Sequence, residues 1–118
     1  MLRIRIVAVA AGVAALALVA SAGAVTPKLT GTVGPGFTIS LKKAGKTLKT
    51  LKAGKYSITV SDKSSIHNFH LTGPGVNKEI TTVPFTGKKT VIVTFKKGTY
   101  KFVCDPHATT MKGTFKVT

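Results

Sequence analysis

The sequence predicts a small all-β domain, a Greek-key antiparallel β-sandwich, and two observations carry this prediction. Apolar and polar residues alternate with a period of two in several short runs, which is the pattern of half-buried antiparallel strands. Turns that contain Gly or Pro separate these runs, and no helical period appears after the first 24 residues. Short strands at such regular spacing are typical of a two-sheet sandwich.

The N-terminal segment has the three parts of an export signal. Arg3 and Arg5 precede an apolar run from Ile6 to Ala20, and small residues then offer Ala-x-Ala cleavage patterns. We expect residues 1–24 to be a signal peptide, which places the mature protein outside the cell, in the cell envelope or in the periplasm. The apolar run has about 15 residues, whereas a membrane span takes roughly 20. This length favours cleavage, and retention as a membrane anchor is the alternative.

After the signal, the composition separates a lead-in from one domain. Residues 25–36 are rich in Thr, Gly and Pro, and we expect a linker or irregular lead-in there, followed by the domain over residues 37–118. The domain shows the same alternation in each expected strand. Its apolar positions are Phe37, Ile39 and Leu41; Tyr56, Ile58 and Val60; Phe69 and Leu71; Val91, Val93 and Phe95; Tyr100, Phe102 and Cys104; and Phe115 and Val117.

The charge of the chain is strongly basic. The whole sequence has a net charge of +15, and from Val25 onward it holds 16 Lys, no Arg and three acidic residues, a net charge of +13. Such a charge attracts acidic surfaces, so an acidic redox partner protein or an anionic cell-envelope surface is expected. Nucleic acid is disfavoured, because bidentate recognition of bases and phosphates relies on Arg. Lysines along strand edges also oppose pairing between chains, and we expect a monomer.

The single cysteine needs an explanation in an exported protein. Cys104 has no intramolecular partner for a disulfide, so an oxidising compartment would attack it unless it is buried, paired between chains or bound to a metal. Cys104, His107 and Met111 lie within eight residues of one another between two expected strands. Thiolate, imidazole and thioether suit copper or zinc. Two His, one Cys and a weak Met contact make up a blue-copper electron-transfer site.

Strand parity selects the second histidine. His67 and His70 point to opposite faces of a regular strand. An inward His67 turns Phe69 and Leu71 inward as well, whereas an inward His70 would bury polar neighbours and expose Phe69. We therefore predict that His67 is the metal ligand. His70 is expected to be an exposed or cross-strand residue with no role at the metal.

From Phe37 onward the sequence resembles the cupredoxins, small blue copper proteins of the plastocyanin and pseudoazurin kind. The matching stretches are His67-Asn68 and residues 97–115, which include Cys104, His107 and Met111. The resemblance implies a cupredoxin-like fold that binds one copper ion through His67, Cys104, His107 and Met111. It also implies that Asn68 fastens the two ligand loops together. Three residues separate His107 from Met111, a spacing between those usual in plastocyanins and amicyanins. The axial contact of Met111 is therefore the part of the site that the resemblance implies least directly.

The combined prediction is an exported type 1 copper protein that carries single electrons through Cu(I) and Cu(II) and is not an enzyme. Pro106 has no N–H to donate to the Cys104 sulfur, which helps set the electronics of the thiolate. His107 is expected at the solvent edge, near the Gly34–Gly36 and Gly73–Gly75 loops. Three alternatives stay open: extracytoplasmic copper storage, delivery or sensing; a copper-free sandwich with a buried thiol; and a wall-binding domain driven by its lysines.

Overall fold

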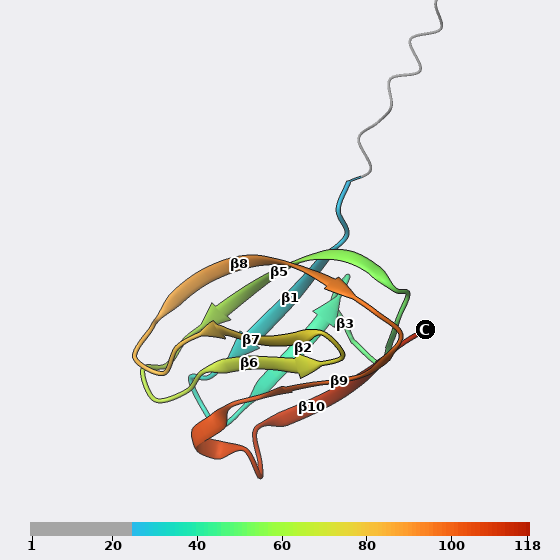
Figure 1. The fold of residues 1–118 in the computed structure, drawn as a ribbon. Helices are drawn as coiled ribbons and strands as arrows, with labels where there is room; N and C mark the ends of the chain where they lie inside the picture. The colour runs from blue at the N-terminus through green and yellow to red at the C-terminus, as the bar shows by residue number, and fades with distance from the viewer. Residues whose placement is uncertain (1–24) are drawn as a thin grey trace, which may run out of the picture.

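The protein forms two stacked β-sheets in the computed structural model, which describes residues 25–118 (Figure 1). The expected signal peptide, residues 1–24, lies outside the described residues. Within residues 25–118 no helix is long and apolar enough to cross a membrane. The elements are β1 (Lys28–Val33), β2 (Ile39–Lys43), β3 (Lys46–Thr47), β4 (Thr50–Leu51), β5 (Gly54–Asp62), β6 (Phe69–Gly73), β7 (Val76–Thr81), β8 (Gly87–Phe95), β9 (Gly98–Val103), the 3-10 helix η1 (Asp105–His107) and β10 (Lys112–Val117).

The strand order confirms the predicted all-β sandwich. One sheet has the order β3-β2-β1-β5-β8 and the other the order β4-β10-β9-β6-β7. Most neighbouring strands are antiparallel, as expected, but β1 pairs with β5 and β10 pairs with β4 in parallel. Parallel neighbours require a crossover connection, and the chain makes one between β1 and β5 when it passes through β4 of the other sheet.

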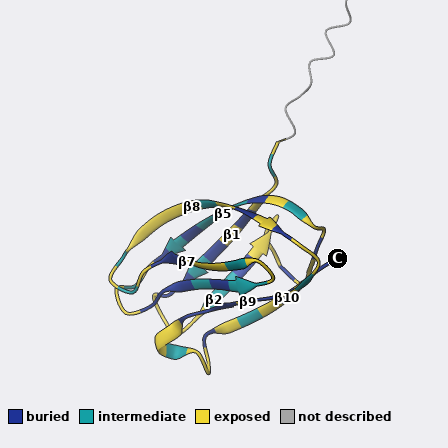
Figure 2. Ribbon diagram, viewed as in Figure 1, coloured by how far each residue is buried: buried dark blue, intermediate teal, exposed yellow. Residues whose placement is uncertain are grey.

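The core lies between the two sheets and follows the predicted alternation (Figure 2). In β5, Tyr56, Ile58 and Val60 are buried, while the residues between them are only partly covered. Burying a large apolar side chain stabilises the fold by about 1.5–3 kcal/mol. The core comprises Leu29, Val33, Leu41, Leu48, Leu51, Tyr56, Ile58, Val60, Phe69, Leu71, Ile80, Val93, Phe95, Tyr100, Phe102, Cys104, Met111, Phe115 and Val117.

The expected linker or irregular lead-in over residues 25–36 is wrong, because half of it forms β1 at the centre of its sheet. Leu29 and Val33 are 1% and 0% exposed and point inward together with Gly31. A Cβ on Gly31 would lie only 3.0 Å from Cε2 of Phe69 and 3.0 Å from Cγ2 of Val60, so any larger residue at this inward position would crowd both side chains. This glycine interrupts the apolar alternation, which is why the sequence pattern did not predict a strand.

Phe37 also differs from the alternation that placed it with Ile39 and Leu41. Strand β2 begins only at Ile39, and Phe37 lies in the preceding loop with 64% of its surface exposed. Leu41 is buried as expected. The alternation therefore holds within β2 but does not extend back to Phe37.

Candidate metal centre

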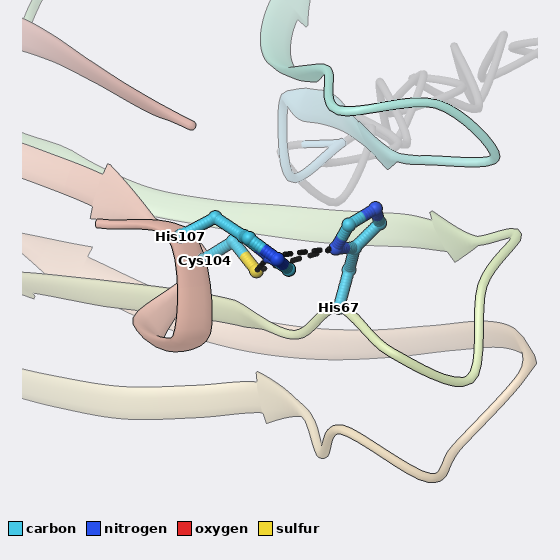
Figure 3. A group of neighbouring side chains, drawn as sticks. All are labelled: His67, Cys104 and His107. Atoms are coloured by element: carbon cyan, nitrogen blue, oxygen red, sulfur yellow. Dashed lines mark hydrogen bonds between the residues drawn. The ribbon is translucent and has the colours of Figure 1, made fainter. Parts of the chain in front are cut away.

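One end of the sandwich brings the predicted ligands together from two loops. His67 lies in the loop between β5 and β6, Cys104 follows β9, and His107 is the last residue of η1. Met111 directly precedes β10. Figure 3 shows the side chains of His67, Cys104 and His107 pointing toward one another. These three form a cluster that can hold a metal ion, and the loop in which Met111 lies borders it.

The donor atoms are close enough to share one ion. Nδ1 of His67 lies 3.1 Å from Nδ1 of His107, and the Cys104 sulfur lies 3.7 Å and 3.6 Å from these two nitrogens. Metal–nitrogen and metal–thiolate bonds are about 2.0 and 2.3 Å long, so donors on one ion can be separated by up to about 4 Å. All three separations fall within this limit. Two imidazoles with a thiolate suit copper.

Burial adds a second indication that this end is built for a ligand. His67 and Cys104 are 0% exposed, whereas His107 is partly exposed. Nε2 of His67 is buried and has no hydrogen-bond partner within residues 25–118. A buried polar group without a partner destabilises a fold by about 1–3 kcal/mol. A buried imidazole is therefore unfavourable for folding alone, and its other nitrogen, Nδ1, faces the Cys104 sulfur and His107, which favours a binding role for the side chain.

The loop from Cys104 to Met111 is held by its own backbone. The N–H of His107 donates to the Cys104 carbonyl at 3.0 Å, and the N–H of Met111 donates to the His107 carbonyl at 2.8 Å. The N–H of Cys104 donates to the Met111 carbonyl at 3.0 Å, which closes the loop and places Met111, 1% exposed, beside Cys104. Pro106 lies at the start of η1, where a missing N–H removes no helical hydrogen bond.

Comparison with known proteins agrees with this geometry. The model of the copper-binding proteins of the plastocyanin/azurin family matches residues 40–118. The chain belongs to this family. No curated protein sequence gives a significant match.

Solved structures of rusticyanin and amicyanin have the same fold as this chain. A rusticyanin variant is 24% identical with a TM-score of 0.56, and the match covers 79% of this chain and 78% of that one. Rusticyanin from Thiobacillus ferrooxidans is 26% identical with a TM-score of 0.52, covering 79% and 77% of the two chains. An oxidised amicyanin variant is 15% identical with a TM-score of 0.50, covering 75% and 80%.

Family and donor set together identify the cofactor. The protein is a small type 1 copper protein of the cupredoxin kind with one copper ion, as the sequence resemblance implied. The plastocyanin/azurin match extends over both ligand loops, including His67 and the segment from Cys104 to Met111.

Asn68 joins the two ligand loops, as expected from the resemblance. Its Nδ2 donates to Oδ2 of Asp105 at 2.7 Å, and its Oδ1 accepts the backbone N–H of Asp105 at 2.7 Å. Asn68 is 1% exposed, so its amide is shielded from water, whereas the Asp105 side chain is 49% exposed. Since Asn68 follows His67 and Asp105 follows Cys104, the pair fixes the separation of two donor residues. The sequence reasoning missed Asp105, although its place beside Cys104 was a signal.

His70 is a cross-strand residue, as predicted. It lies on β6 opposite Glu79 of β7 and Val103 of β9. Its Nδ1 donates to Oδ2 of Asp105 at 2.9 Å, and its Nε2 donates to Oδ1 of Asn77 at 2.6 Å. Partial burial lowers the pKa of His70, but the hydrogen bonds to Asn77 and Asp105 and the nearby carboxylates outweigh it, so the pKa lies above its ordinary value.

Only one of the two expected Gly-Pro loops adjoins the site. Gly34 lies beside His67, since a Cβ on Gly34 would be 3.3 Å from Cδ2 of that ring. The Gly73–Gly75 turn lies at the opposite end, because Pro74 accepts a hydrogen bond from the Tyr100 hydroxyl there. Strand β6 starts at the site and runs away from it, which carries the β6–β7 turn to the far end (Figure 1).

Proposed function

We propose that the chain is an exported carrier of single electrons in which His67, Cys104, His107 and Met111 hold one copper ion. The observation that carries the proposal is the convergence of two imidazole nitrogens and one thiol sulfur within 3.7 Å of one another, with His67 and Cys104 fully buried. Copper bound there supplies the Cu(I)/Cu(II) couple. The role is that of an electron carrier and not of an enzyme.

Rigid placement of the donor atoms supports electron transfer. The closed loop from Cys104 to Met111 and the double hydrogen bond between Asn68 and Asp105 restrict how far the donors can move. A site that keeps one geometry needs little rearrangement when its charge changes. Pro106 places no N–H near the thiolate, which leaves its electron density undiminished.

The accessible side of the centre is at His107. This ring is partly exposed, whereas His67 and Cys104 are fully buried, so electrons would leave through His107. Asp62 is buried, which leaves Glu79 and Asp105 as the carboxylates outside the core among 16 lysines of the described residues. We infer that the partner is an acidic redox protein, with an anionic envelope surface as a further contact, and that the carrier is a monomer.

Reconstitution with copper tests the proposal. Adding Cu(II) to the purified domain should give an intense thiolate-to-copper band in the visible spectrum, and reduction should bleach it. Cys104→Ser and His67→Gln should lose the band, while His70→Gln, the matched control, should keep it. Absence of the band in the wild-type protein would overturn the copper assignment.

Voltammetry then separates a carrier from a storage or delivery protein. A carrier gives a reversible one-electron wave and keeps its copper over repeated cycles. A protein that shows the coloured band but no reversible wave, or that releases copper on reduction, would contradict the electron-transfer role.

A further inference from the structure

Phe37 is an exposed aromatic residue that lies against both histidines of the metal centre. Its ring centroid is 5.3 Å from that of His67 and 4.9 Å from that of His107, with interplanar angles of 67° and 83°. The two histidine rings are 4.8 Å apart at 79°. Each ring therefore meets the other two edge to face, an arrangement that contributes about 0.5–1.5 kcal/mol per aromatic pair.

The loop that carries Phe37 is shaped to reach this position. Gly34 has a φ of 72°, a conformation that strains other residues. A Cβ there would also lie 2.9 Å from Cβ of Ser64 and 3.3 Å from His67. The N–H of Gly34 donates to the carbonyl of Thr38 at 2.9 Å, which closes the turn around Phe37. Residues 34–38 are thus fixed against the loop that holds His67.

Folding alone does not explain a phenylalanine at this position. A large apolar side chain stabilises a fold by about 1.5–3 kcal/mol when it is fully buried. Phe37 is 64% exposed, so it contributes only part of this energy. The turn itself is closed by backbone atoms and needs no aromatic side chain. What the ring does is cover the edges of the two histidines, and His67 is 0% exposed although it lies at the end of the sandwich.

We propose that Phe37 is a positioning residue that covers the metal centre, excludes water from the donor atoms and fixes the ring of His107. The inference rests on the proposed function, since it concerns the same copper site. Water favours the more highly charged ion, because charge is costly to hold in a dry site. Removing the ring should therefore stabilise Cu(II) relative to Cu(I) and lower the reduction potential.

Three variants test the inference: Phe37→Ala removes the ring, Phe37→Tyr retains it, and Ile66→Ala is the control. Ile66 is 52% exposed and directly precedes His67, so its removal changes a similar amount of exposed apolar surface. In the metal-free protein, Phe37→Ala should shift the ring resonances of both His67 and His107 in NMR spectra. With Cu(II) bound, it should raise water-proton relaxation and copper release to EDTA severalfold and lower the potential.

Phe37→Tyr and Ile66→Ala should behave like the wild-type protein in each measurement. Equal water-proton relaxation, copper release and potential in Phe37→Ala and Ile66→Ala would overturn the inference while leaving the proposed function intact. A wild-type protein that binds no copper would instead overturn the proposed function. In that case the NMR measurement on the metal-free protein tests the inference about Phe37 by itself. Unchanged resonances of His67 and His107 in Phe37→Ala would overturn the placement of the Phe37 ring.

Discussion

The two ends of the sandwich are closed in different ways. At the end away from the metal centre, the ring of Tyr100 stacks on Phe115 with centroids 5.6 Å apart and meets Phe95 edge to face at 4.8 Å. The Tyr100 hydroxyl donates to the Pro74 carbonyl at 2.9 Å and accepts the N–H of Lys96 at 3.0 Å. Apolar surface is buried there and the buried hydroxyl is satisfied.

At the metal end, polar side chains are buried with unmatched atoms. Nε2 of His67 and Oδ2 of Asp62 have no hydrogen-bond partner among the described residues. The donor atoms of His67, Cys104 and His107 face one another and not the core. The comparison indicates that the aromatic end supplies stability, whereas the metal end gives up stability to hold a binding site.

The largest expected effect comes from removing an aromatic ring at the stable end. Phe95→Ala should lower the free energy of unfolding by about 3–5 kcal/mol, because it leaves a cavity among Tyr56, Tyr100 and Phe115. Denaturant unfolding of the metal-free protein measures this. The copper band of the folded fraction should be unchanged, and a loss below 1 kcal/mol, far under the range for such cavities, would break the comparison.

The connection between the ligand loops should be the next in size. Asn68→Ala leaves the backbone N–H of Asp105 without its partner and removes one of the two side chains that donate to its carboxylate, and we expect the free energy of unfolding to fall by about 2 kcal/mol. The altered ligand loop should also shift the copper spectrum. The control is Asn77→Ala, which loses only an exposed bond to His70. Equal effects of the two substitutions would contradict the role of Asn68.

A substitution at a donor should separate binding from stability. His67→Leu removes the buried imidazole with its unpaired nitrogen, so the metal-free protein should be as stable as the wild type or more stable by up to about 2 kcal/mol. The same variant should lose the copper band. Calorimetry of the metal-free forms makes the comparison. A large destabilisation would show that His67 supports the fold as Tyr100 does.

The smallest effect concerns pH. Because the pKa of His70 is raised in the fold above its ordinary value of 6.5, the protonated ring stabilises the folded state. This contribution is complete below pH 6.5 and is lost as pH rises through the folded-state pKa. The groups that face the ring are Asp105, Asn77 and Glu79. Unfolding followed against pH should show this decline in the wild type and a flatter profile in His70→Gln. The same pH dependence of the free energy of unfolding in both proteins would contradict the stabilising role of protonated His70.

Much of the fold could be predicted because strand alternation directly reports a buried face. This worked in β5, where Tyr56, Ile58 and Val60 all point inward. It failed in β1, where the inward residue between Leu29 and Val33 is Gly31, which packs closely against the ring of Phe69. The need for a small residue at position 31 depends on Phe69, which lies far along the sequence, so the local pattern of apolar residues does not predict it.

The site residues divide in the same way: those close together in the sequence could be predicted, and contacts between distant segments could not. Cys104 and His107 could be predicted from their spacing in one loop, and strand parity over residues 66–71 selected His67, although the structure places His67 in the loop before β6. The contact of Met111 with the metal stays a prediction. The contacts of Asp105 and Phe37 with other segments could not be predicted, although Asp105 lies beside Cys104 in the sequence. Asp105 acts through Asn68 and His70 of another segment, and Phe37 has the apolar character of a core residue although it covers two histidines.

X-ray absorption at the copper edge of the loaded protein tests most directly whether the donor cluster holds the metal. With one equivalent of copper, the spectrum should show one short sulfur neighbour and two imidazole nitrogens, and the sulfur should disappear in Cys104→Ser. A copper ion surrounded only by nitrogen and oxygen in the wild-type protein would contradict the assignment of Cys104, and with it the type 1 centre at this end of the sandwich.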